Sequence, residues 1–198
     1  MIFASLIRTA IALLTFATPA LAQYVETCVD MHRESADLFT GLEAEGWTRI
    51  ERSADVADRL LWITAISYLG GDSGAETLSS IVETQRKAVV NFDRLKALST
   101  SETRVYGDRD GLLIAAWQQP LDGFASVQCR VSVSGLDLPP LDARFGAYIG
   151  TDISADAGQL LQATFQYNRD EILAVMPNAL PPDLVIDIRH QYQIEDPE

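Results

Sequence analysis

Apolar residues recur every three or four positions through the first half of the chain, which is the spacing of amphipathic helices. This pattern predicts helices over residues 27–45, 53–69 and 73–98. The stretch 60–69 is apolar nearly all round, so its period does not separate a buried helix from a buried strand. Both alternatives stay open for that stretch.

From residue 103 onwards the apolar period changes to two, the repeat of strands with one wet face. The sequence GDRDG at 107–111 predicts a turn between the first two strands. We expect residues 142–158 to be irregular or briefly helical, and 169–176 to form a short helix that Pro177 ends. The predicted strands cover residues 103–106, 112–118, 125–133, 161–167 and 186–194.

Strands with one apolar face are typical of antiparallel sheets, and helices followed by strands indicate an α+β fold. We therefore expect a two-layer sandwich, with the three N-terminal helices packed on one face of a mainly antiparallel sheet of four to five strands. Residues 23–198 are a suitable length for a single domain with its own core.

Residues 1–22 have the pattern of a secretory signal peptide, with Arg8 before an apolar stretch and small residues at Ala20 and Ala22. Cleavage after Ala22 would leave Cys28 inside the mature chain, whereas a lipoprotein needs its cysteine at the cleavage point. The sequence thus predicts a periplasmic or secreted protein with no membrane anchor after cleavage.

The chain has only two cysteines, Cys28 and Cys129. Export makes a disulfide between them the expected pairing, because oxidising compartments allow disulfides to persist. Cys129 alternates with polar neighbours in its predicted strand and should face the core. The bridge would then hold the start of the mature chain against the inner face of the sheet.

The formal net charge is −13, from 28 acidic and 15 basic residues. Nucleic acid is a poor partner for such a surface, since binding it depends on neutralising phosphates with Lys and Arg. Anionic membranes are disfavoured for the same reason. We interpret the acidic excess mainly as a source of solubility.

Two short motifs suggest chemistry. Gly71-Asp72-Ser73-Gly74 resembles the nucleophile motif of trypsin-like serine proteases, but the resemblance ends at Ala75, where that family has another glycine. A helix cap by Ser73 explains the same residues. Asp152, Ser154 and Asp156 resemble the first ligands of an EF-hand, whose glycine and glutamate are replaced by Ala157 and Ala163. We expect an Asx-type loop there.

Acidic residues and His32 gather near the mature N-terminus, at Glu26, Asp30 and Glu34, but a helix would turn His32 away from Asp30 and Glu34. His190 lies on the apolar side of its strand and is expected to be a core histidine with a hydrogen bond. We therefore assign no catalytic residue, metal ligand or cofactor.

The outer face of the predicted sheet offers the strongest candidate for recognition, because its side chains are uncharged or basic on an acidic protein. Amide and guanidinium groups supply many hydrogen-bond donors for carbohydrate or peptide. The candidate residues are Gln128, Arg130, Gln162, Thr164, Gln166, Arg189 and Gln191. A solvated sheet face without a partner explains the same pattern.

These features favour an exported binding or accessory protein, rather than an enzyme, whose partner is an unknown protein or a small polar ligand. Two alternatives remain. One is a hydrolase that uses paired carboxylates in a cleft between helices and sheet. The other is an inhibitor of a cationic enzyme, which rests on charge alone and requires a salt-sensitive complex.

Overall fold

The computed structural model describes residues 26–66, 75–108, 111–121, 123–134, 148–156, 159–166 and 169–194. The predicted signal peptide at 1–22, the GDSG motif and the linker that Pro139-Pro140 predicts over residues 136–141 lie outside these ranges.

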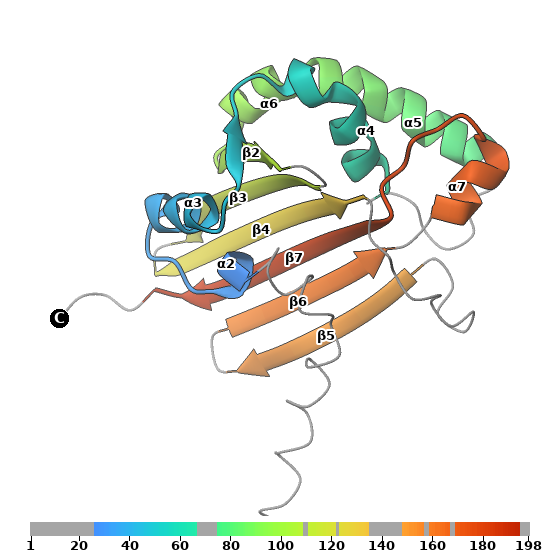
Figure 1. Cartoon of the computed structure of the whole chain (residues 1–198). Coiled ribbons are helices and arrows are strands. Elements are labelled where there is room, and N and C mark those ends of the chain that lie inside the picture. Colours follow the sequence, from blue (N-terminus) through green and yellow to red (C-terminus); the bar gives the residue numbers. More distant parts are fainter. Residues whose placement is uncertain are drawn as a thin grey trace, which may run out of the picture.

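The fold is α+β: most described helices lie in the first half of the chain, and most strands of one antiparallel sheet follow (Figure 1). No described helix is both long and apolar enough to cross a membrane. The helices are α2 (Glu26–Val29), α3 (Ser35–Ala44), the 3-10 helix η2 (Ser53–Val56), α4 (Ala57–Ile66), α5 (Ala75–Val90), α6 (Phe92–Leu98) and α7 (Arg169–Val175).

In the described part of the chain the sheet has seven strands in the order β1-β2-β3-β4-β7-β6-β5, and every neighbouring pair is antiparallel. The prediction of four to five strands is wrong: six strands have six or more residues, and the short β1 is the seventh. The strands are β1 (Thr48–Ile50), β2 (Glu102–Gly107), β3 (Gly111–Leu121), β4 (Phe124–Val133), β5 (Tyr148–Asp156), β6 (Gln159–Gln166) and β7 (Leu184–Gln193).

The structure differs from the predicted elements at three other places. The first predicted helix is broken at residues 30–34, and the third is broken at Asn91 between α5 and α6. Residues 148–156 form β5, where we expected an irregular stretch and an Asx-type loop. Pairing with β6 explains this strand better than its own sequence, which has no clean alternation. The ambiguous stretch 60–66 is helical.

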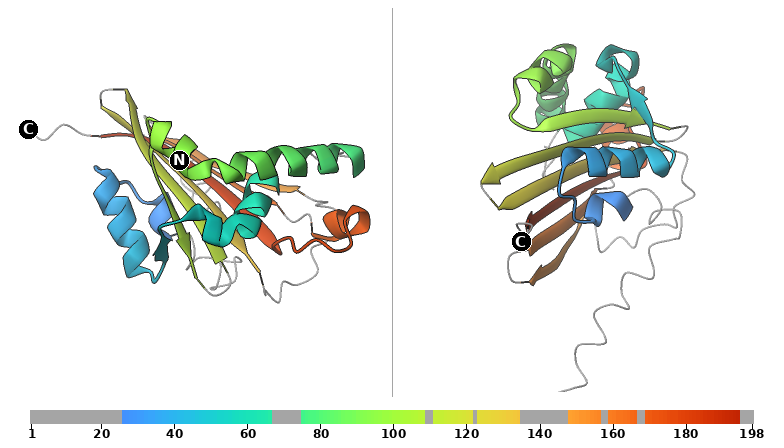
Figure 2. Two further views of the ribbon diagram at one scale, coloured as in Figure 1. Left: turned by 90° about the horizontal axis from the view of Figure 1, so that it is seen from above. Right: turned by 90° about the vertical axis from the view of Figure 1, so that its left-hand side faces the viewer.

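Helices lie on both faces of the sheet, rather than on the single predicted face (Figure 2). Adjacent strand residues point to opposite faces, so Leu113 packs in a core with α2 and α3, while Leu112 packs in a second core with α4 and α5. We call these the α3-side core and the α4-side core. β3 and β7 are apolar at consecutive positions near one end, which is the pattern of strands covered on both faces.

The predicted disulfide is present: Cys28 of α2 is bonded to Cys129 of β4, with their Cα atoms 6.1 Å apart. Both residues are fully buried in the α3-side core, as the alternation of β4 predicts. Helix α2 also packs closely on α3, since a Cβ at Gly41 would lie only 2.7 Å from Cγ2 of Thr27. The start of the described chain is therefore fixed between α3 and the sheet.

The described helices cover the α4-side face of the sheet at one end. Leu112, Ser132 and Val185 are neighbours in β3, β4 and β7, and all three are buried. Four residues further from that end, Ala116, Gln128 and Arg189 form the equivalent row and are partly or fully exposed. The helices thus leave an open area of the same face over β4, β7 and β6.

Candidate functional site

The seven predicted recognition residues lie on the α4-side face of three neighbouring strands, and we call them the polar face. Register brings them together: Gln128 is paired with Arg189, which is paired in turn with Gln162. The members are Gln128 and Arg130 on β4, Arg189 and Gln191 on β7, and Gln162, Thr164 and Gln166 on β6.

Gln166 differs from the other members of the polar face because it is buried. Gln166 is only 8% exposed, because its strand neighbour is Val185 at the helix-covered end of the sheet. The prediction that Gln166 belongs to the open recognition surface is therefore wrong. The other six residues are partly or fully exposed.

Asp187 is the residue at the centre of the polar face that sequence reasoning missed. Arg130 and Thr164 flank it in the neighbouring strands. Its Oδ1 accepts a hydrogen bond of 3.1 Å from Nε2 of Gln128, and its Oδ2 lies 3.5 Å from Nε of Arg130 and 3.5 Å from Nη2 of Arg189. The sequence could have identified it, because Asp187 alternates with Arg189 and Gln191 along β7 and so lies on the same face of the sheet.

The two arginines that pair with Asp187 differ in their exposure to solvent. The Asp187 side chain is 11% exposed and that of Arg130 is 24% exposed, so both are largely removed from water. The Arg189 side chain is 59% exposed and presents its guanidinium to solvent. On β4 and β7 this area holds two arginines and one aspartate, and the register pairs Asp152 of β5 with Gln162 at its edge, so the area is near neutral on a chain whose net charge is −13.

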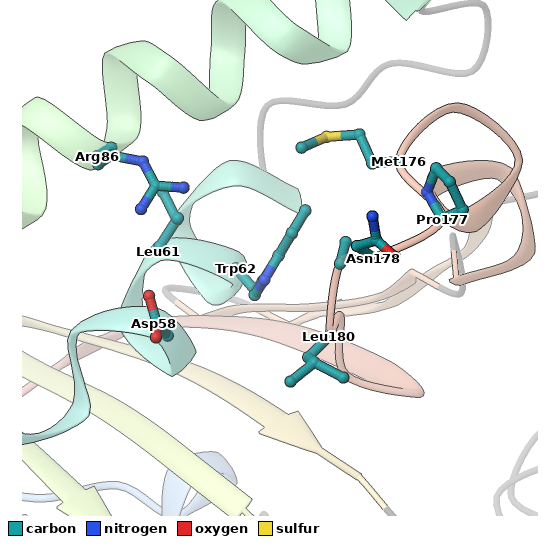
Figure 3. Close-up of a pocket in the computed structure, with 9 residues that line it drawn as sticks. Asp58, Leu61, Trp62, Arg86, Met176, Pro177, Asn178 and Leu180 are labelled. Atoms are coloured by element: carbon teal, nitrogen blue, oxygen red, sulfur yellow. The ribbon is translucent and has the colours of Figure 1, made fainter.

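A pocket of about 410 Å³ lies on the helical side of the molecule, between α4, α5 and the segment after α7 (Figure 3). Trp62 stands in its middle, with Arg86 and Asp58 to one side and Asn178 to the other. The pocket is lined by Asp58, Leu61, Trp62, Arg86, Met176, Pro177, Asn178, Ala179 and Leu180.

The second described pocket, of about 280 Å³, lies beside α5 and α6 and includes Phe92, Leu95 and Lys96 in its lining. A hydrolase of the type considered above needs two acids that converge on one cleft. Asp58 is the only carboxylate that lines either pocket. Neither of these two pockets supplies the required pair.

The chain's two histidines lie close to each other in the α3-side half of the molecule, and both are buried. Tyr192 Oη donates to the carbonyl of His32 at 2.6 Å and accepts from its backbone N–H at 2.7 Å. The Nε2 atom of His32 lies 2.7 Å from the carbonyl oxygen of Thr27. These contacts fix the loop after α2 to the end of β7.

His190 is a core histidine, as predicted. Its Nε2 atom lies 2.7 Å from the side-chain amide of Gln159, and its ring packs tilted against that of Tyr192, with the ring centroids 4.6 Å apart. Burial lowers the pKa of His190 below the usual 6.5, and nearby His32 acts in the same direction, whereas Asp30 opposes the shift. The neutral imidazole is therefore the form that this fold favours.

The described residues contain no group of three or more His, Cys, Asp and Glu side chains that could hold a metal ion. No protein-family model matches the chain, and no curated protein or solved structure matches it either.

Proposed function

We propose that the protein is an exported binding protein, periplasmic or secreted, that holds an acidic carbohydrate on its polar face. The observation that carries this proposal is the cross-strand row Gln128, Arg189 and Gln162, which lines up amide and guanidinium groups on an open sheet surface. The Cys28–Cys129 disulfide supports export, because such bonds are typical of oxidising compartments.

The chemistry of the polar face fits a ligand rich in hydroxyl and carboxylate oxygens. Glutamine side chains donate to and accept from hydroxyl groups, and an exposed guanidinium binds a carboxylate through two parallel hydrogen bonds. Asp187 holds Arg130 in the sheet surface and leaves Arg189 facing solvent. Pre-positioned donors lose less entropy when they bind a ligand than mobile ones do.

Binding of the mature, disulfide-bonded protein to an array of neutral and acidic oligosaccharides tests this function. We expect the wild type to bind acidic glycans and the double variant Arg189→Ala, Gln191→Ala to lose that binding. The matched control is Arg33→Ala, an exposed arginine in the loop after α2. An array on which no acidic glycan binds, or on which the double variant binds like wild type, rejects the polar face as a carbohydrate site.

A further inference from the structure

Two opposite charges line one side of the pocket in Figure 3, and neither forms an ion pair with another described residue. These are Arg86 of α5 and Asp58 of α4. Both side chains are exposed, and their neighbours along the helices have other contacts: Glu83 binds Lys87 at 2.8 Å, and Arg59 donates to the carbonyl of Gly111. Arg86 and Asp58 are thus available to a ligand.

The floor of the pocket is apolar. Trp62 and Leu61 belong to the α4-side core, so this floor is continuous with the packed interior and is fixed in position. Leu180 contributes an apolar rim that is 88% exposed, and Met176 adds an adaptable thioether side chain. The lining is therefore mainly apolar, with two charged groups at one side.

The segment that forms the far wall is also held in place. Ile172 anchors α7 in the α4-side core. The backbone N–H of Met176 donates to the carbonyl of Ile172 at 2.7 Å, and that of Ala179 donates to Met176 at 2.9 Å. These hydrogen bonds form a turn that presents Asn178 to the pocket. The wall is preformed, as ligand pockets usually are.

We propose that this pocket binds an apolar α-amino acid in its zwitterionic form. The carboxylate would pair with Arg86, the ammonium group with Asp58, and the side chain would lie against Trp62 and Leu61. Because both charges line one side of the pocket, a simple anion would face Asp58 and a simple cation would face Arg86. A zwitterion satisfies both, and about 410 Å³ is within the usual range for small-molecule sites. This site is separate from the polar face and does not depend on the function proposed for it.

Titration calorimetry with L-leucine, L-methionine and L-phenylalanine tests the proposal on the mature, disulfide-bonded protein. We expect saturable binding of at least one of them, and a change in the fluorescence of Trp62 that Trp62→Phe removes. For the amino acid that binds, its N-acetyl form lacks the ammonium charge and its amide lacks the carboxylate. Each should bind about tenfold or more weakly, the value of one charged hydrogen bond.

Two variants separate specific recognition from apolar adsorption. Arg86→Gln and Asp58→Asn should each weaken binding of the free amino acid about tenfold or more. The matched controls, Arg94→Gln on α6 and Asp55→Asn on η2, change exposed residues outside the pocket lining and should leave the affinity unchanged. The proposal is overturned if none of the three amino acids binds at millimolar concentration, if the capped forms bind equally well, or if the pocket variants bind like wild type.

Discussion

At the scale of single residues, Asp187 has the largest consequence for the polar face. A carboxylate that is 11% exposed loses most of its hydration, and this loss is compensated only if charged or hydrogen-bonding groups surround it. Gln128, Arg130 and Arg189 provide those groups from two strands. Asp187 therefore positions the side chains of the polar face through these contacts rather than contacting a ligand itself.

Replacing Asp187 with asparagine should lower the free energy of unfolding by about 1–3 kcal/mol, because Arg130 keeps its charge and loses its counter-ion. Urea denaturation at neutral pH measures the change. Asp170→Asn, at an exposed position of α7, is the matched control and should stay within about 0.5 kcal/mol of wild type. Equal stability of the two variants would show that the ion pairs around Asp187 contribute nothing to the fold.

His190 makes the stability of the protein depend on pH. Burial lowers its pKa in the fold below 6.5, so the unfolded chain binds a proton more readily than the folded one. This contribution to stability is complete above pH 6.5 and is lost as the pH falls through the lowered folded value. His190→Gln keeps a polar partner for Gln159 but has no imidazole to protonate. Its free energy of unfolding should therefore fall less steeply than that of wild type between pH 7 and about 5. Parallel pH profiles for variant and wild type would contradict this assignment.

At the scale of elements, the disulfide joins α2 to the middle of β4 across a separation of 101 residues. Closing so long a loop restricts the unfolded chain, and we expect the double variant Cys28→Ala, Cys129→Ala to lose about 2–5 kcal/mol of stability. Chemical denaturation of both proteins with and without reductant measures it. Reductant should destabilise the wild type by a similar amount and leave the double variant unaffected. If reductant does not change the free energy of unfolding of the wild type, the bridge does not stabilise the fold as predicted.

The elements that the sequence predicts best are those whose alternation reflects one buried face. In β4 the residues Ala125, Val127, Cys129, Val131 and Val133 alternate strictly and are all buried. The break between α2 and α3 was not predictable in this way, because it depends on distant partners: Tyr192 binds both backbone groups of His32. Strand β5 likewise exists through its pairing with β6, which no local pattern encodes.

At the scale of the whole molecule, the sequence identifies most of the polar face but not how the sheet is covered. Periodicity shows which residues of one strand share a face, and that was sufficient to group six exposed members of the polar face. It does not show which helix covers which face, so it wrongly predicts that Gln166 is exposed and that all three N-terminal helices share one face. The pocket around Trp62 combines three elements distant in sequence, and no motif marks it.

The two cores share the strands β3, β4 and β7, and this sharing predicts a single cooperative unfolding transition. Trp47 lies in the α3-side core and Trp62 in the α4-side core, so each can report one side. In the background Trp117→Phe, removing either Trp47 or Trp62 leaves one reporter, and the two urea transitions should coincide. Leu113→Ala alters only the α3-side core, yet it should lower the midpoint reported by Trp62 as far as that reported by Trp47, at a cost of about 2–5 kcal/mol. Separate midpoints would mean that α4 and α5 unfold independently of the sheet.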